Sequence, residues 1–286
     1  MSKISISSSA MLCDVSISAW SGRKLDRAVS EEVNSAKGAS RSASRVNKSL
    51  FADDARLKAI NDYTASIRNW LMQVTLPWSD RGPRLVTTAQ FFDFKRELDE
   101  RKDQFDTLVQ DFVQMYPTLI SAQAFRLGAM FNRDEYPPVD QIAHKFRMSY
   151  TFLPVPEAGD FRVDIGSEAM EQLRQEFEAD YQRRVEDSMR DLWGRLKDTL
   201  DRIVDRLGTD EIGKNKIFRD SLVTNAIEVC DMLKYANVTN DPALEAARRA
   251  TEQALLGITP DELRKNDDVR RSVKEEVQAI VDKFSF

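Results

Sequence analysis

The sequence predicts an α+β protein that is predominantly α-helical, with long amphipathic helices and a small antiparallel β-sheet. Three observations support this fold class. The chain of 286 residues contains only 10 glycines and 9 prolines beside 31% charged residues, which is typical of helix-rich proteins. Apolar residues recur at helical spacing through most of the chain. In a few short segments they instead alternate with polar residues, as they do in half-buried strands.

The N-terminal part is expected to contain a tail, a strand, a helix and a linker, in that order. Residues 1–10 predict a disordered tail, and residues 13–19 alternate between apolar and polar side chains. Residues 25–36 carry apolar side chains at helical spacing, and Gly38 predicts the end of that helix. The serine-rich and basic segment 38–49 is expected to be a flexible surface linker.

Two helices are expected before the middle of the chain. The first runs from a cap at Asp53 to a stop before Pro77, and the residues LPWSDRGPR then form a turn. The second spans residues 91–115, whose apolar residues keep the spacing of three and four that is typical of a coiled coil. Arg101 occupies the one polar position of this seam, where it needs an acidic partner or a route to solvent.

A central hairpin is expected next. In FRMSYTF, residues 146–152, every second residue is apolar or aromatic, and DFRVDI, residues 160–165, repeats the pattern after a loop that contains two prolines. A two-stranded hairpin is only marginally stable in water. We therefore expect the N-terminal strand to join this hairpin in a small sheet that helices cover.

The next predicted helix is unusually long. Eleven apolar or aromatic residues recur at helical spacing from Met170 to Leu207. At ~1.5 Å per residue, a helix over 167–207 is roughly 60 Å long, about twice the width of a small domain. We expect part of its apolar stripe to pack against another long helix, either 91–115 or one from a second subunit. The candidate residues of this helix-packing interface are Phe105, Phe112, Phe177, Tyr181 and Trp193.

The C-terminal region is expected to be a run of shorter helices. Asp241 with Pro242 starts one of them, Gly257 ends it, and the residues TPDE that follow form a capping box. We therefore expect three parts in the chain. They are a disordered tail over 1–10, a helical core with the sheet and the long helix over 11–207, and a helical region over 208–286.

The segment GTDEIGKN, residues 208–215, differs from the phosphate-binding signature G-x-x-x-x-G-K-[ST] at one position. A phosphate loop follows a strand, yet the residues before Gly208 have helical spacing. Asp210 and Glu211 would place negative charge against the phosphates, and Asn215 replaces the hydroxyl that holds magnesium. We therefore expect a helix break, with a new helix that begins near Lys214.

The composition offers little for catalysis or for metal binding. His144 is the only histidine, and Cys13 and Cys230 are isolated, so neither a zinc cluster nor a disulfide framework is expected. We expect no cofactor, no metal and no enzymatic activity. No apolar run approaches the ~18 residues of a membrane span, and the N-terminus lacks the apolar core of a secretory signal. These features favour a cytoplasmic protein that does not bind membranes.

Charge is unevenly distributed along the chain. Residues 1–50 carry eight basic and four acidic side chains, a net charge of +4, whereas the whole chain has a net charge of −5. An acidic body argues against a general nucleic-acid-binding protein, but the basic segment could hold a single strand through stacking and phosphate contacts. The candidate nucleic-acid contacts are Trp20, Arg23, Lys24, Arg27, Arg41, Arg45 and Lys48.

Several phrases of the sequence occur together in a known family. SISAWSGRKLDR, LPWSDRG, FNRDEYP and FRMSYTFLPVPEAGDFRVDI, in this order, resemble a family of uncharacterised proteins of tailed bacteriophages and proteobacteria. The resemblance covers residues from about 11 to 235, and no catalytic residues are established for that family. It implies a gene context beside a MoxR-type AAA+ ATPase and a von Willebrand A protein similar to cobaltochelatase subunits. The nucleotide site would then lie in a neighbouring polypeptide.

We therefore expect a non-enzymatic scaffold or adaptor in the cytoplasm of a bacterial host cell. Its long amphipathic helices would mediate homo-oligomerisation or docking onto the AAA+ ATPase, with the von Willebrand A protein as a further partner. The alternative is a protein that binds single-stranded DNA through its basic N-terminal segment.

Overall fold

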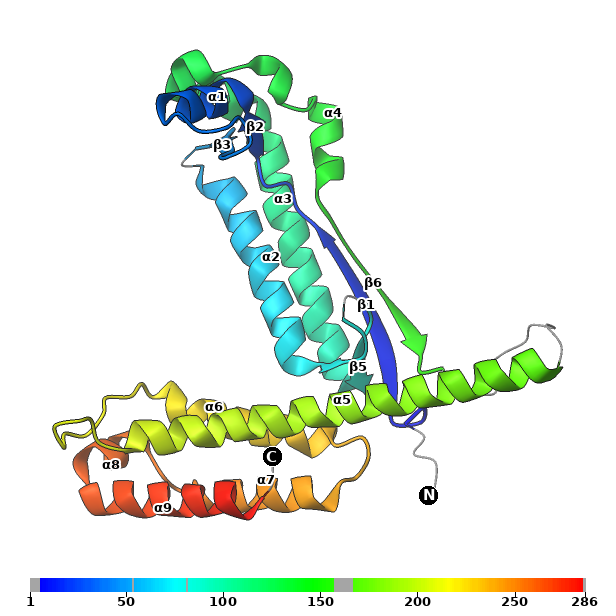
Figure 1. Ribbon diagram of the computed structural model, residues 1–286, viewed down its shortest axis with the longest axis vertical. Coiled ribbons are helices and arrows are strands. Elements are labelled where there is room, and N and C mark those ends of the chain that lie inside the picture. Colours follow the sequence, from blue (N-terminus) through cyan, green and yellow to red (C-terminus); the bar gives the residue numbers. More distant parts are fainter. Residues whose placement is uncertain (1–5, 53, 81, 157–166, 285–286) are drawn as a thin grey trace. The chain divides into compact units, whose positions relative to one another are not determined.

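The computed structural model describes the chain except for residues 1–5, 53, 81, 157–166 and 285–286 (Figure 1). The described residues are mostly helical and include short antiparallel strands, which confirms the predicted fold class. The chain divides into two compact units. Unit 1 consists of Met1–Asp14, Met72–Phe94 and Thr151–Phe286, and unit 2 consists of Val15–Leu71 and Lys95–Tyr150. Each unit combines segments that are distant in sequence, and the division expected at residue 207 stays a prediction.

A four-stranded sheet has the order β4–β5–β1–β6. Its strands are β1 (Ala10–Ser18), β4 (Leu76–Pro77), β5 (Arg84–Thr87) and β6 (Arg147–Pro154). β5 pairs in antiparallel orientation with both β1 and β4. β1 and β6 confirm the N-terminal strand and the first strand of the expected hairpin. The expected second strand, residues 160–165, lies outside the described residues.

The sequence predicts only a turn where β4 and β5 form. β4 is two residues long and includes Pro77, so it is too short to show alternation. In β5, both Leu85 and Val86 are 1% exposed, so neighbouring residues are buried on opposite faces of the strand. A strand that is buried on both faces has no period of two for the sequence to reveal.

Unit 1 contains a bundle of helices from the second half of the chain. The helices are α5 (Ser167–Leu207), α6 (Ser221–Ala236), α7 (Pro242–Ala254), α8 (Pro260–Lys265) and α9 (Asp267–Lys283). Both α6 and α9 pack against α5, and α7 packs against α6 and α9 (Figure 1). The prediction of one unbroken helix over 167–207 is confirmed.

The chain itself covers much of the apolar stripe of α5. Each stripe residue from Tyr181 to Leu207 is buried in the bundle core. We expected part of the stripe to pack against the 91–115 helix or a second subunit. From Tyr181 to Leu207, α6 and α9 fold back along the stripe instead, and for the rest of it the expectation stays a prediction. Periodicity identifies the apolar face of each short helix but does not say which faces meet.

The ends of the C-terminal helices follow the predicted capping. The Asp241 side chain accepts hydrogen bonds at the N-terminus of α7, and Thr259 and Glu262 form the capping box of α8. Asn266 caps α9 in the same manner. The predicted signals at Asp241 and Thr259 are confirmed because each of them involves residues within one turn of a helix.

The segment GTDEIGKN forms a closed turn after α5, as the helix-break interpretation requires. Oδ1 of Asp210 accepts hydrogen bonds from the backbone N–H groups of Ile212 at 3.0 Å and Lys214 at 2.8 Å. A carboxylate therefore occupies the amide groups that a phosphate would need. α6 begins only at Ser221, so the expected helix start near Lys214 is wrong.

Unit 2 contains a hairpin and three helices. They are β2 (Arg23–Asp26), β3 (Val46–Ser49), α1 (Arg27–Ala36), α2 (Ala55–Val74) and α4 (Val139–Ile142). A further helix, α3 (Phe91–Leu127), lies mainly in this unit and extends past its predicted end at residue 115 through Pro117. Four 3₁₀ turns complete the described elements of the chain: Thr88–Gln90, Gly128–Met130, Arg133–Glu135 and Ala143–Lys145.

Arg101 has the acidic partner that its position in α3 requires. Its Nη2 donates a hydrogen bond of 2.5 Å to Glu97, one turn earlier on the same helix. The guanidinium group also stacks on the ring of Trp70 in α2, 4.3 Å from the ring centroid. The one polar residue of the seam thus contributes to the contact between α2 and α3, which run side by side in Figure 1.

The core of unit 2 is a cluster of aromatic rings around Phe51. Its ring centroid lies 5.4 to 5.8 Å from those of Trp20, Phe112, Tyr116 and Tyr136. Most of these pairs are edge-on, the arrangement that aromatic quadrupoles favour.

The segment 38–49 is not wholly the flexible linker that the sequence predicts. Its last four residues form β3, which pairs with β2. Asn34, which is 2% exposed, donates hydrogen bonds to the carbonyl groups of Arg41 and Ser44 and accepts one from the Ser44 hydroxyl. A single buried amide thereby orders the serine-rich part, which composition does not reveal.

Candidate functional site

The basic residues of the N-terminal segment gather on one small part of unit 2. We call residues 23–49, which form β2, α1 and β3, the basic lobe. They include seven basic and three acidic side chains. Six of the basic side chains are exposed and have no carboxylate within ion-pair distance among the described residues. They are Arg23, Lys24, Arg27, Lys37, Arg41 and Arg45.

Lys48 does not belong to this exposed set. Its ammonium group lies 2.7 Å from a carboxylate oxygen of Glu135 and 3.6 Å from one of Asp26, and it donates a hydrogen bond to the carbonyl of Met130. The side chain is 7% exposed, and the hydrogen bond with Glu135 raises the pKa of Lys48 above its usual value. We therefore correct its assignment as a phosphate contact, because its charge is already neutralised inside the protein.

Trp20 is half-buried. Its ring contacts Phe51 and Tyr116 edge-on, at 5.8 and 6.5 Å between centroids. The ring therefore packs against the aromatic core of unit 2 with only part of its surface exposed, and its role in base stacking stays a prediction. What the structure brings together for nucleic acid is thus a set of cations without a fully exposed aromatic partner from the predicted residues.

The candidate helix-packing residues fall into two groups. Phe105 and Phe112 are buried in unit 2, at 1% and 0% exposure. Tyr181 and Trp193 pack in unit 1, where the Tyr181 hydroxyl accepts a hydrogen bond from the backbone N–H of Ile6. These four residues therefore pack within their own units. The sequence alone could not decide whether they pack there or against a second subunit.

Phe177 marks the border of the covered part of α5. It is partly buried against the core of unit 1, whereas Leu173, one turn earlier, is 36% exposed. Met170 is half-buried, and most polar residues between 170 and 180 are exposed. We call residues 170–180 the α5 arm. The arm continues the apolar stripe beyond the residues that the bundle buries.

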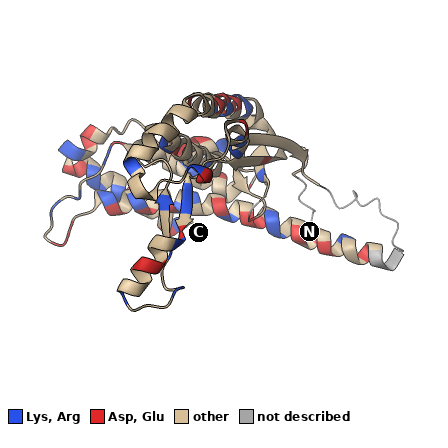
Figure 2. Cartoon of the chain, turned by 90° about the horizontal axis from the view of Figure 1, so that it is seen from above, with Lys and Arg blue, Asp and Glu red and all other residues tan. Residues whose placement is uncertain are grey.

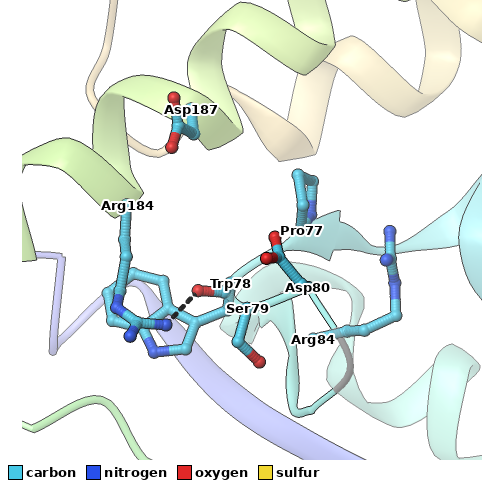
Figure 3. Close-up of a pocket in the computed structure, with 7 residues that line it drawn as sticks. All are labelled: Pro77, Trp78, Ser79, Asp80, Arg84, Arg184 and Asp187. Carbon is cyan, nitrogen blue, oxygen red and sulfur yellow. Dashed lines mark hydrogen bonds between the residues drawn. The ribbon is translucent and has the colours of Figure 1, made fainter.

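A cavity of about 180 Å³ lies between the β4–β5 connection and α5 (Figure 3). Its lining residues are Pro77, Trp78, Ser79, Asp80, Arg84, Arg184 and Asp187. Arg184 donates a hydrogen bond to the Trp78 carbonyl and pairs with Asp180 at 2.6 Å, and Arg84 donates to the Thr75 carbonyl. Burial lowers the pKa of Arg84. Both guanidinium groups are thus held by protein acceptors, as a structural role requires.

This cavity also lacks the arrangement of a nucleophilic site. The Ser79 hydroxyl is buried and has no hydrogen-bond partner among the described residues, so no base is in place to activate it. Asp80 and Asp187 face the cavity in Figure 3 without a histidine beside them. We therefore assign no catalytic role to this cavity.

Metal and thiol chemistry find no support in the part of the chain that the structure describes. No group of three or more His, Cys, Asp or Glu side chains there could hold a metal ion. Cys13 and Cys230 are buried free thiols, and burial raises the pKa of each to about 12. His144 is exposed within a 3₁₀ turn.

Two further findings bear on the class of protein. Across the described residues, no helix combines the length and the apolar character that crossing a bilayer requires. The chain matches no protein-family model, no curated protein and no solved structure. The α5 arm and the basic lobe are therefore judged on their own physical properties.

Proposed function

We propose that the protein is a non-enzymatic scaffold or adaptor that binds another protein through the α5 arm. The observation that carries this proposal is the continuation of the apolar stripe past the bundle. The stripe is buried from Tyr181 to Leu207, but Leu173 is 36% exposed on the same face of the same helix. An amphipathic helix that lays such a face into a groove is a common mode of protein recognition.

The family resemblance supplies a specific partner for this proposal. Proteins of the similar family are encoded beside a MoxR-type AAA+ ATPase and a von Willebrand A protein. An adaptor without a nucleotide site of its own would fit such a neighbourhood, since the ATPase supplies the hydrolysis. The scaffold would then either self-associate or dock onto the ATPase, within the cytoplasm of the bacterial host.

Light scattering of the purified chain, alone and mixed with the neighbouring ATPase, tests the proposal. We expect assembly or complex formation that Met170→Glu combined with Leu173→Glu weakens at least tenfold, because both changes place charge on the stripe. Gln172→Glu combined with Gln175→Glu is the matched control, since it adds the same charge to the opposite face. A monodisperse monomer that does not bind the ATPase would contradict the proposal.

A second candidate function is binding of single-stranded nucleic acid by the basic lobe. The observation that favours it is the set of exposed cations on the lobe that lack carboxylate partners among the described residues. Phosphate contacts of this kind release counterions from the nucleic acid on binding, and this release becomes less favourable as the salt concentration rises, so the affinity falls steeply. Without a fully exposed aromatic platform, the binding would be weak and independent of sequence.

Titration of a fluorescent oligothymidine at 50 and 200 mM salt tests this second function. We expect Arg23→Ala, Lys24→Ala and Arg41→Ala together to abolish binding that the wild type shows at low salt. Arg202→Ala, Lys214→Ala and Arg219→Ala form the control set, because they remove three exposed cations from unit 1. Equal losses from both sets would mean that only the net charge matters, and absence of wild-type binding at 50 mM salt would exclude this function.

A further inference from the structure

The α5 arm is acidic as well as partly apolar. Residues 170–180 carry four acidic side chains and one basic side chain. In Figure 2, acidic residues, drawn in red, recur along the end of α5 that adjoins the grey segment. At ~100° per residue, Glu171 and Glu178 lie on one side of the stripe, and Glu176 lies on the other together with Asp180, which Arg183 and Arg184 of the same helix already pair. Two α5 arms from different copies would therefore repel each other, so the occupant of this face should be basic.

The basic lobe has the complementary character. Besides its exposed cations, it presents two apolar side chains, Leu25 at 37% and Val33 at 38% exposure. α1, which carries Val33, has 10 residues and is roughly 15 Å long at ~1.5 Å per residue. The α5 arm, which spans residues 170–180, is of similar length by the same rule. The two surfaces are thus similar in length and in apolar content, and their net charges are opposite, +4 for residues 23–49 and −3 for the α5 arm. The positive charge of the lobe comes from β2 and from residues 37–48, because α1 carries Glu31 and Glu32 beside Arg27.

We propose that the α5 arm of one copy of this chain docks onto the basic lobe of a second copy. This inference rests on the proposed function and names the partner of the same surface. It is favoured over an unrelated partner because the same chain carries both halves of the contact, with opposite charge. Leu173 of the arm would lie against Val33 or Leu25, and the flanking carboxylates would pair with Arg23, Lys24 or Arg27.

Such a contact joins two different surfaces and is therefore head-to-tail. A pair joined by one contact keeps one free arm and one free lobe, so further contacts lead to a closed ring, of which a reciprocal dimer is the smallest, or to an open chain. The two short helical surfaces would bury less area than a typical stable interface. We therefore expect micromolar self-association that depends strongly on salt, since exposed charges contribute most of the attraction.

Sedimentation velocity of the full chain from 5 to 200 μM, at 50 and 500 mM salt, tests this inference. The wild type should show a mass that rises with concentration and a dissociation constant at least tenfold higher in high salt. The arm-reversed variant carries Glu171→Lys and Glu176→Lys, which changes the net charge of the α5 arm from −3 to +1. The lobe-reversed variant carries Arg23→Glu, Lys24→Glu and Arg27→Glu, which changes the net charge of residues 23–49 from +4 to −2. Each variant alone should be monomeric, because its arm and its lobe then have the same sign of charge.

The decisive experiment uses an equimolar mixture of the two variants. In the mixture, the positive arm of one variant meets the negative lobe of the other. Opposite charges then face each other again, so the dissociation constant should return to within about threefold of the wild-type value. Circular dichroism of each variant checks that the helices remain. A mixture that stays monomeric, or lobe reversal without effect on self-association, would overturn the inference.

Two other outcomes separate this inference from the proposed function. A wild-type chain that stays monomeric at 200 μM but binds the ATPase through the arm would overturn the inference and leave the proposed function standing. A monomeric chain whose lobe variants lose only oligothymidine binding would assign the lobe to nucleic acid and also overturn the inference.

Discussion

Nε of Arg270 donates a hydrogen bond of 2.9 Å to the backbone carbonyl of Leu207, the last residue of α5. Nη2 of the same guanidinium group donates to the carbonyls of Arg206 at 2.7 Å and Lys216 at 2.8 Å. The last carbonyls of a helix have no partner within the helix, and a cation there also interacts favourably with the helix dipole. Arg270, which is 4% exposed, therefore holds the end of α5 and the turn that follows it.

We predict that Arg270→Ala lowers the free energy of unfolding by about 3 kcal/mol, since it leaves several buried carbonyls without a donor. Arg270→Lys should lose roughly 2 kcal/mol, because an ammonium group cannot reach the same carbonyls as a planar fork. Urea unfolding measures both. Arg271→Ala, at an exposed neighbour, is the control and should change stability by less than about 0.5 kcal/mol. Equal stability of the variants at 270 and 271 would contradict this role.

Lys48 should be essential for the stability of unit 2 rather than for binding. Lys48→Met leaves the carboxylates of Glu135 and Asp26 without their cation, and we expect a loss of about 3 kcal/mol. Lys24 pairs with Lys48 in the register of β2 and β3 but is exposed, so Lys24→Met is a matched control with little effect. Hydrogen exchange of the amides in β3 reports the change locally. Similar exchange in both variants would show that the buried ion pair is unimportant.

Glu245 gives the protein a specific response to acid. Its carboxylate accepts hydrogen bonds from Arg248 at 2.7 and 2.8 Å and from Arg249 at 2.6 Å. The hydrogen bonds from Arg248, more than those from Arg249, lower the pKa of Glu245 to about 2. Because the folded pKa is depressed, this stabilisation is present above the ordinary value near 4.5 and is lost as the pH falls towards 2.

The difference in melting temperature between the wild type and Glu245→Gln measures this effect. We expect the wild type to be more stable at pH 6 and the difference to shrink progressively between pH 4.5 and pH 2. A difference that stays constant over this range would show that Glu245 contributes through packing and not through its charge.

The two thiols should be inert in the native protein. Cys13 and Cys230 are each 1% exposed, and burial raises the pKa of both to about 12, so very little thiolate exists at neutral pH. Reaction with Ellman's reagent should therefore be slow in buffer and rapid in 6 M guanidinium. Fast labelling of either cysteine under native conditions would contradict the burial of that side chain.

Features that depend on local periodicity could be predicted from the sequence. The bounds of α5 agree with the prediction because its apolar residues recur without a break from Met170 to Leu207. The capping box at Thr259 could also be predicted, because it involves residues within one helical turn. The acidic partner of Arg101 lies one turn away on the same helix.

Features that depend on contacts between distant segments could not be predicted. Lys48 reads as one more exposed cation of a basic segment until the fold places it against Glu135. Arg270 likewise lies in an amphipathic helix with several other charged residues, and only the return of α9 to the end of α5 buries it. Leu85 and Val86 give no alternation, because both faces of β5 are covered.

The central claim is that the α5 arm contacts another protein chain. Placing a photoactivatable benzoylphenylalanine at residue 173, on the stripe, tests it most directly, and the same group at Ala179, on the opposite face, is the control. The account predicts that position 173 gives a cross-linked protein adduct and that position 179 does not. Mass spectrometry should map the cross-link either to the basic lobe of a second copy or to the ATPase. Equal cross-linking from both positions, or none from position 173 in the presence of both candidate partners, would contradict it.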